Sequence, residues 1–138
     1  MSKLLAQVLR WLAVVAVLVF LPASNVLLLM RPEFVSFEYR RPGFPPAERY
    51  DAQTRLHWAQ ESVRYLLAPD DAALRQQGRH ISQFEIAGEP VYNEREVQHM
   101  VDVKAVLGGL TWAWRIAGLT LLAGVALSTT SMAVVYAV

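Results

Sequence analysis

Residues 11–30 read WLAVVAVLVFLPASNVLLLM, and residues 116–138 read IAGLTLLAGVALSTTSMAVVYAV; neither stretch contains a charged side chain. An α-helix rises about 1.5 Å per residue, so roughly 20 apolar residues cross a hydrocarbon layer about 30 Å thick. The two stretches therefore predict a mainly α, integral membrane protein with two transmembrane helices. We expect the helices to flank a small α-rich segment on the extracytoplasmic side.

This pattern divides the chain into three parts. We expect residues 1–31 to form the first transmembrane helix, residues 32–104 the extracytoplasmic segment, and residues 108–138 the second transmembrane helix. An interfacial helix over residues 93–107 leads into the second span.

The basic N-terminal flank, with Lys3 and Arg10, is also typical of a signal peptide. However, the apolar run continues beyond Pro22 and has no clear small-residue cleavage site, which favours an uncleaved anchor. The same flank favours an N-terminus on the cytoplasmic side.

Composition excludes several classes of function. The net charge of the 138 residues is +1, so no overall field favours binding to nucleic acid. The chain has no cysteine, which excludes thiolate catalysis, disulfides and Cys-ligated zinc. All twelve acidic residues lie between positions 31 and 104, together with ten Lys and Arg, so this segment is nearly neutral. The segment is predicted to be folded, and not a basic tail that binds anionic lipid.

Local patterns predict the elements between the spans. They are a strand over 34–39, a helix over 47–67, a short helix over 72–77 and a strand over 81–86. Pro69 ends the first helix, Asp70 or Asp71 caps the second, and Gly78 ends it.

A further helix is predicted to start at Asn93. Asn93 followed by Glu96 has the spacing of a capping box, in which each residue bonds the other's backbone. We expect this helix to run toward the second span and to break or bend near Gly108 and Gly109.

The densest polar cluster, NEREVQHMVDVK at 93–104, lies on this helix. Glu96, His99 and Asp102 are three residues apart and therefore share one face. A carboxylate beside an imidazole can orient it and raise its basicity, as a general base requires. The alternative interpretation is an interfacial histidine without a catalytic role. His57 and His80 are interpreted as structural or surface residues.

No metal or other cofactor is expected. Glu96-x-x-His99 has the spacing found in carboxylate-bridged di-iron bundles, but those sites need two such pairs and two further glutamates. This chain has one pair.

Two cations near the second span are candidate substrate-binding residues. Lys104 and Arg115 could contact a lipid phosphate or a developing oxyanion, although Arg115 could also be a snorkelling interfacial residue. Within the span, Gly118, Gly124 and the polar run 128–131 favour close helix packing. They predict partners in the bilayer, either additional transmembrane helices or another subunit.

The segment 93–104 resembles the corresponding segment of the bacterial lipoprotein intramolecular transacylases, the Lit family. The order of elements is also similar: an N-terminal span, a helix that ends in a Tyr-Leu pair (Tyr65-Leu66), the helix with His99, Asp102, Val103 and Lys104, and a second span. Members of that family typically have four spans and a second histidine on the later ones, whereas no histidine follows His99. The resemblance therefore implies one of three alternatives: a fragment of a longer protein, a chain that borrows helices from a partner, or an inactive chain.

The resemblance implies a membrane acyltransferase of the bacterial cytoplasmic (inner) membrane. Such an enzyme moves an acyl chain from the diacylglyceryl group of a lipoprotein to the α-amine of its N-terminal cysteine. By position, His99 corresponds to the catalytic histidine, with Glu96 and Asp102 beside it. The alternative is a non-catalytic, two-span accessory or structural subunit of a membrane complex.

Overall fold

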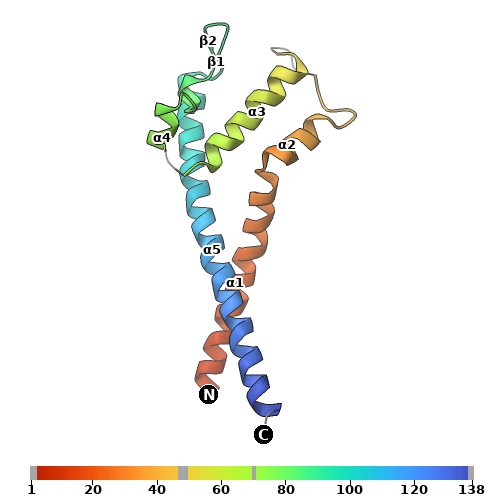
Figure 1. The fold of residues 1–138 in the computed structure, drawn as a ribbon, viewed down its shortest axis with the longest axis vertical. Coiled ribbons are helices and arrows are strands. Elements are labelled where there is room, and N and C mark those ends of the chain that lie inside the picture. The colour runs from red at the N-terminus through yellow and green to blue at the C-terminus, as the bar shows by residue number, and fades with distance from the viewer. Residues whose placement is uncertain (1–2, 47–49, 70, 137–138) are drawn as a thin grey trace. The chain divides into compact units, whose positions relative to one another are not determined.

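The computed structural model describes residues 3–46, 50–69 and 71–136 and is mainly helical. Its elements in chain order are α1 (Lys3–Leu29), α2 (Pro32–Tyr39), α3 (Ala52–Leu67), α4 (Asp71–Gln76), the 3-10 helix η1 (Ile81–Gln83), β1 (Glu85–Ile86), β2 (Glu89–Pro90) and α5 (Glu94–Tyr136) (Figure 1). Contacts divide the chain into two units. We call residues 1–25 with 110–138 the span unit, and residues 26–109 the polar unit.

Helices α1 and α5 are each long and apolar enough to cross a membrane, which agrees with the two predicted spans. Pro22 lies inside α1 without ending it. Helix α5 continues through Gly108 and Gly109, so the predicted break there was wrong. Glycine lowers helix stability by only about 1 kcal/mol relative to alanine, which a long helix of good helix formers tolerates.

An aromatic contact joins α1 and α5 inside the span unit. The Phe20 and Trp114 rings stack with their centroids 5.6 Å apart. The Trp114 Nε1–H donates to Ser24 Oγ at 2.8 Å, and the Ser24 hydroxyl donates to the Phe20 carbonyl at 2.7 Å. In an apolar surrounding these bonds satisfy two donors that would otherwise lack acceptors. The predicted polar run 128–131 lies in α5, but its side chains are outside the described part of the structure.

Gly118 lets the Phe20 ring approach α5. A Cβ at position 118 would lie 3.1 Å from Phe20 Cε2, closer than ordinary van der Waals contact. We therefore expect Gly118→Leu to displace this ring and to lower the thermal unfolding temperature of the purified protein. Gly124→Leu is the matched control, because a Cβ there would meet no atom of the described residues within 4 Å. Equal unfolding temperatures for the two variants would argue against this packing.

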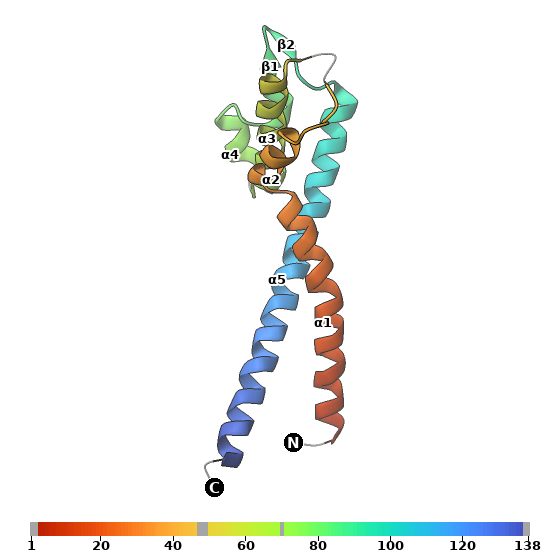
Figure 2. The same ribbon diagram turned by 90° about the vertical axis from the view of Figure 1, so that its right-hand side faces the viewer.

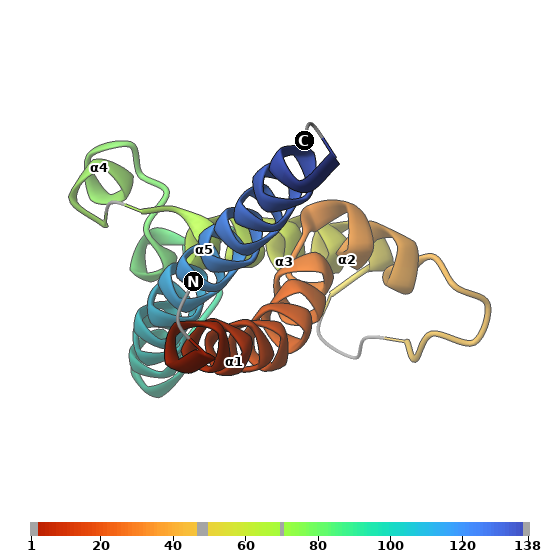
Figure 3. The same cartoon turned by 90° about the horizontal axis from the view of Figure 1, so that it is seen from below.

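Helix α2 occupies the segment predicted as a strand over 34–39, so that prediction was wrong. Pro32 lies in the first turn of α2, where its fixed φ suits a helix and its missing N–H breaks no bond. The helix packs against α3, since Gln60 Nε2 donates to Ser36 Oγ at 2.6 Å and to the Pro32 carbonyl at 3.4 Å. The two helices lie side by side in every view (Figure 1, Figure 2 and Figure 3). Tertiary packing therefore overrides the loose alternation of apolar residues.

Helix α3 begins later than predicted. Asp51 caps it by accepting hydrogen bonds from the backbone N–H groups of Gln53 at 2.9 Å and Thr54 at 3.0 Å. The predicted start at residues 47–49 lies outside the described residues. The helix ends at Leu67, two residues before Pro69, as predicted.

The segment after α3 forms short elements. Gly78, at φ +67°, follows the end of α4 as predicted, and the Arg79 N–H donates to the Leu74 carbonyl at 2.8 Å. Asp71 is the first residue of α4, while Asp70 lies outside the described residues. The predicted strand over 81–86 is correct only at β1, because its first half is η1. Strand β1 pairs with β2 across Ala87 and Gly88, both at positive φ, as in a type I′ turn.

The core of the polar unit surrounds the C-terminal half of α3. Its buried side chains are Ser62, Val63, Tyr65, Leu66, Leu74, His80, Ile81, Phe84, Val91 and Leu107. This core holds α4, η1 and the hairpin against α3 and the first half of α5, and so positions the candidate site.

Candidate functional site

The first turn of α5 is fixed by the predicted capping box, which the structure confirms. Asn93 Oδ1 accepts from the Glu96 backbone N–H at 3.0 Å, and the Asn93 backbone N–H donates to Glu96 Oε2 at 2.8 Å. Tyr92, just before the box, is tied to α3 through Ser62, with 2.6 Å between their hydroxyl oxygens. The Ser62 hydroxyl also donates to the Trp58 carbonyl at 2.7 Å, so Tyr92 is the donor to Ser62.

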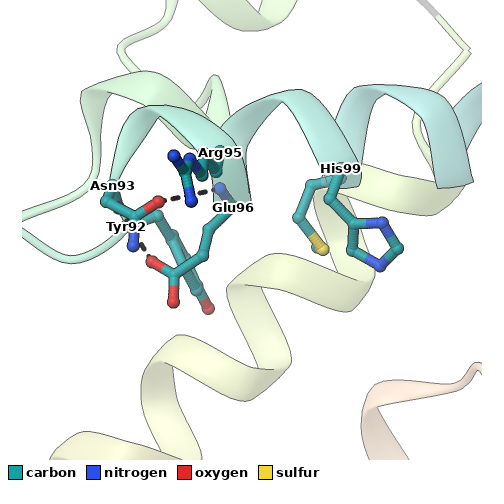
Figure 4. A pocket seen from close by; sticks show the side chains of 6 residues that line it. Tyr92, Asn93, Arg95, Glu96 and His99 are labelled. Atoms are coloured by element: carbon teal, nitrogen blue, oxygen red, sulfur yellow. Dashed lines mark hydrogen bonds between the residues drawn. The ribbon is translucent and has the colours of Figure 1, made fainter.

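A groove with a volume of about 350 Å³ lies beside this helix start (Figure 4). It is lined by Tyr92, Asn93, Arg95, Glu96, His99 and Met100. The His99 side chain is exposed, and within the described residues its ring makes no hydrogen bond. The imidazole is therefore open to a molecule that enters the groove.

The two acids expected to flank His99 bond elsewhere. The Glu96 carboxylate is used by the capping box, and Figure 4 shows it turned toward Asn93 and away from the His99 ring. Asp102 Oδ1 accepts from Gln98 Nε2 at 3.0 Å, and Asp102 is outside the set that lines the groove. Glu96 and His99 therefore line the same groove while Asp102 does not, and the expected pairing of His99 with Glu96 and Asp102 is not formed. A spacing of three residues permits contact without requiring it, and both acids have local amide partners.

Lys104, a predicted substrate-binding residue, is instead engaged within the protein. Its Nζ donates to the carbonyls of Tyr65 at 2.5 Å and Ala68 at 2.6 Å, and it lies 3.2 Å from Asp71 Oδ1. The same ammonium lies 4.4 Å from the centroid of the Tyr65 ring. An ammonium has three N–H donors, and three oxygens surround this one. Lys104 therefore closes the C-terminal end of α3, where carbonyls lack helical partners.

Lys104 belongs to a polar cluster that the sequence did not predict: Tyr65, Asp71, His80 and Lys104. Tyr65 and His80 are each 1% exposed, and their rings meet edge to face at 5.1 Å. His80 Nε2 lies 3.9 Å from Asp71 Oδ2. The Tyr65 hydroxyl and His80 Nε2 are buried, and neither has a hydrogen-bond partner among the described residues. These residues come from α3, α4, the N-cap of η1 and α5, so no local spacing could have indicated them.

His80 has a defined tautomer in this arrangement. Its Nδ1 accepts from the Ser82 backbone N–H at 3.2 Å and lies 2.7 Å from Ser82 Oγ. The neutral ring therefore carries its proton on Nε2, which faces Asp71. Burial lowers the pKa of His80; Arg75 and Lys104 lower it as well, while Asp71 opposes them.

The lowered pKa predicts a pH-dependent stability. An unfolded histidine titrates near pH 6.5, so below that pH the unfolded chain binds a proton that folded His80 does not. The contribution of neutral His80 to the free energy of unfolding is fully present above about pH 6.5. It is lost as the pH falls toward the pKa that His80 has in the folded protein. We expect the free energy of unfolding to fall between pH 7 and pH 5, and to fall less steeply in a His80→Gln variant. His57→Gln, at an exposed histidine, should keep the wild-type slope; equal slopes for all three proteins would contradict this role of His80.

The remaining predicted site residue, Arg115, lies in the span unit. Its side chain is exposed, and the guanidinium carbon lies 5.6 Å from the centroid of the Trp112 ring. This contact is typical of an arginine beside an aromatic residue at a membrane surface. Among residues 3–46, 50–69 and 71–136, no three His, Asp or Glu side chains are grouped to hold a metal ion.

Comparison with known proteins found no matching family model, no similar curated protein and no similar solved structure.

Proposed function

We propose that this chain is part of a bacterial membrane acyltransferase that modifies lipoproteins. In this proposal, the acyl chain moves from the diacylglyceryl group to the α-amine of the N-terminal cysteine. The observation that carries the proposal is an exposed His99 ring, which makes no hydrogen bond to the described residues, at a groove beside the start of a helix that continues into an apolar span. The resemblance of residues 93–104 to the Lit family supports the same assignment.

The proposed chemistry needs a base and a proton carrier. An α-amine has a pKa of about 8 and is mostly protonated at pH 7, so a proton must leave before its nitrogen can attack the ester carbonyl. The ammonium first loses one proton to water. In the proposed step, the neutral amine attacks, the N–C bond forms, the C–O bond to the glyceryl oxygen breaks, and His99 carries the second proton from nitrogen to that oxygen. Amine and ester belong to one lipidated cysteine, so the transfer gains from proximity.

The structure limits which residues can assist this step. Three protein oxygens surround the Lys104 ammonium, so it is not available to an oxyanion in this arrangement. Among the residues that line the groove, Glu96 is the acidic one. We assign Glu96 to substrate binding at the groove, where its carboxylate attracts the protonated amine before that amine loses its proton.

The decisive experiment uses a synthetic diacylated lipopeptide with a free N-terminal amine, mixed with the full-length protein in bacterial membranes. Intramolecular transfer leaves the total mass unchanged but converts one ester-linked acyl chain into an amide-linked chain, which resists mild alkali. The matched control is the same lipopeptide with an acetylated amine. If mild alkali removes every acyl chain from both peptides after incubation, no chain has moved to the amine and the proposal is refuted.

The second candidate is a two-span accessory subunit of a membrane complex. It is favoured by the fact that the described acids beside His99 bond to other partners. This function predicts stable co-purification with a larger membrane protein and lipopeptide conversion that is independent of His99.

The proposal also places the polar unit outside the cytoplasm of a bacterial cell. A cysteine introduced at exposed Glu89 should then react with a membrane-impermeant maleimide in intact spheroplasts. Reaction only after lysis would place this unit in the cytoplasm.

A further inference from the structure

The exposed large apolar side chains of the polar unit lie in the end of α1, in α2, at the end of α3 and in α5. Among its described residues they are Val26, Leu28 and Leu29 in α1, Phe37 in α2, Leu67 in α3 and Val106 in α5. Phe37 is 63% exposed and Val106 71% exposed. The described residues from 71 to 105 include no such side chain.

Hydrogen bonds show that α2 and α3 run in opposite directions. Near the start of α3, Arg55 Nη1 donates to the Pro45 carbonyl at 2.8 Å, beyond the end of α2. Further along α3, Gln60 bonds the Pro32 carbonyl at the start of α2. Leu67 is seven residues after Gln60, or about 10 Å along the helix axis. It therefore lies beyond the start of α2, on the side where α1 joins.

The same end of the polar unit holds Val106 of α5. Lys104 bonds the Ala68 carbonyl, directly after Leu67, and Val106 is two residues from Lys104. Phe37 is eight residues after the end of α1 at Leu29, so the chain keeps it close to that helix. The exposed apolar residues of α2, α3 and α5 are thus tied by short connections to the end of the first span.

We propose that this end of the polar unit rests in the headgroup layer of the bilayer that α1 crosses, with Phe37, Leu67 and Val106 in contact with lipid. An apolar patch in water is unfavourable, and aromatic rings such as that of Phe37 are stable at the membrane boundary. The hairpin and the start of α5 instead expose Glu85, Glu89 and Glu94, which suit water. This inference goes beyond the proposed activity and does not depend on it.

The absence of cysteine makes a direct test possible, because one introduced cysteine carries one label. Phe37→Cys, labelled with an environment-sensitive fluorophore, is reconstituted as full-length protein in phosphatidylcholine vesicles. Lipids with a nitroxide near the headgroup should quench this label several-fold more than a label at Glu89→Cys in β2. Leu67→Cys should behave like Phe37→Cys, which protects the test against a local effect of one substitution.

Two outcomes would overturn the inference. Equal quenching at positions 37, 67 and 89 would show that this end is not in lipid. The label at position 37 could also be quenched at a low protein-to-lipid ratio and not at a high one. That result would show that a second copy of the chain covers the surface. Strong quenching at positions 37 and 67 at every ratio supports lipid contact.

Discussion

A His99→Ala variant is expected to lower the rate of acyl transfer by about 100-fold to 10,000-fold, the range that general base catalysis contributes. The proposed step needs a group that accepts the amine proton and returns it to the leaving oxygen, and methyl can do neither. The rate is measured with the free-amine lipopeptide, as the growth of peptide that keeps one acyl chain after mild alkali.

His57→Ala is the matched control, since His57 is also an exposed histidine of the polar unit but does not line the groove. It should leave the rate unchanged. Because His99 is exposed and makes no hydrogen bond within the described residues, its replacement should also leave the unfolding temperature nearly unchanged. A fully active His99→Ala protein would remove His99 from the mechanism and favour the accessory subunit.

Lys104→Met is expected to produce the largest loss of stability, about 2–4 kcal/mol. Hydrogen bonds from charged donors each contribute about 1.5–3 kcal/mol, and this change breaks two of them at the end of α3. It also leaves Asp71 without its cation. That carboxylate is 40% exposed, so water limits this part of the loss. The measurement is reversible urea unfolding in detergent, followed by fluorescence of the polar unit.

Arg95→Met tests whether the loss is specific to Lys104. Arg95 is a cation of the same helix, but its side chain is exposed, so the change should alter stability by less than about 0.5 kcal/mol. Similar losses for the two variants would show that Lys104 does not act through the contacts described above.

Local signals predicted the elements whose stability is mainly local. The two charge-free runs predicted both long apolar helices, Asn93 with Glu96 predicted the start of α5, and Gly78 predicted the end of α4. In each case the deciding interaction lies within a few residues, or is the transfer of one helix into an apolar medium.

The candidate site was predicted only in part, because only some of its contacts are local. His99 was identified from its neighbours and does line a groove, whereas the expected acid partners found other hydrogen bonds within their own helix. The buried position of His80 had no sequence signal, because Tyr65 and Asp71 reach it only after α3 and α4 have packed.

The sequence by itself determined the two apolar helices and the polar segment between them, because transfer of side chains between water and lipid depends on composition alone. Tertiary structure decided that residues 32–39 are helical and that Lys104 binds within the protein. Lys104 is 39 residues from Tyr65 and 36 from Ala68, and Gln60 is 24 from Ser36. Contacts over such separations form only when the helices pack, and no local pattern records them.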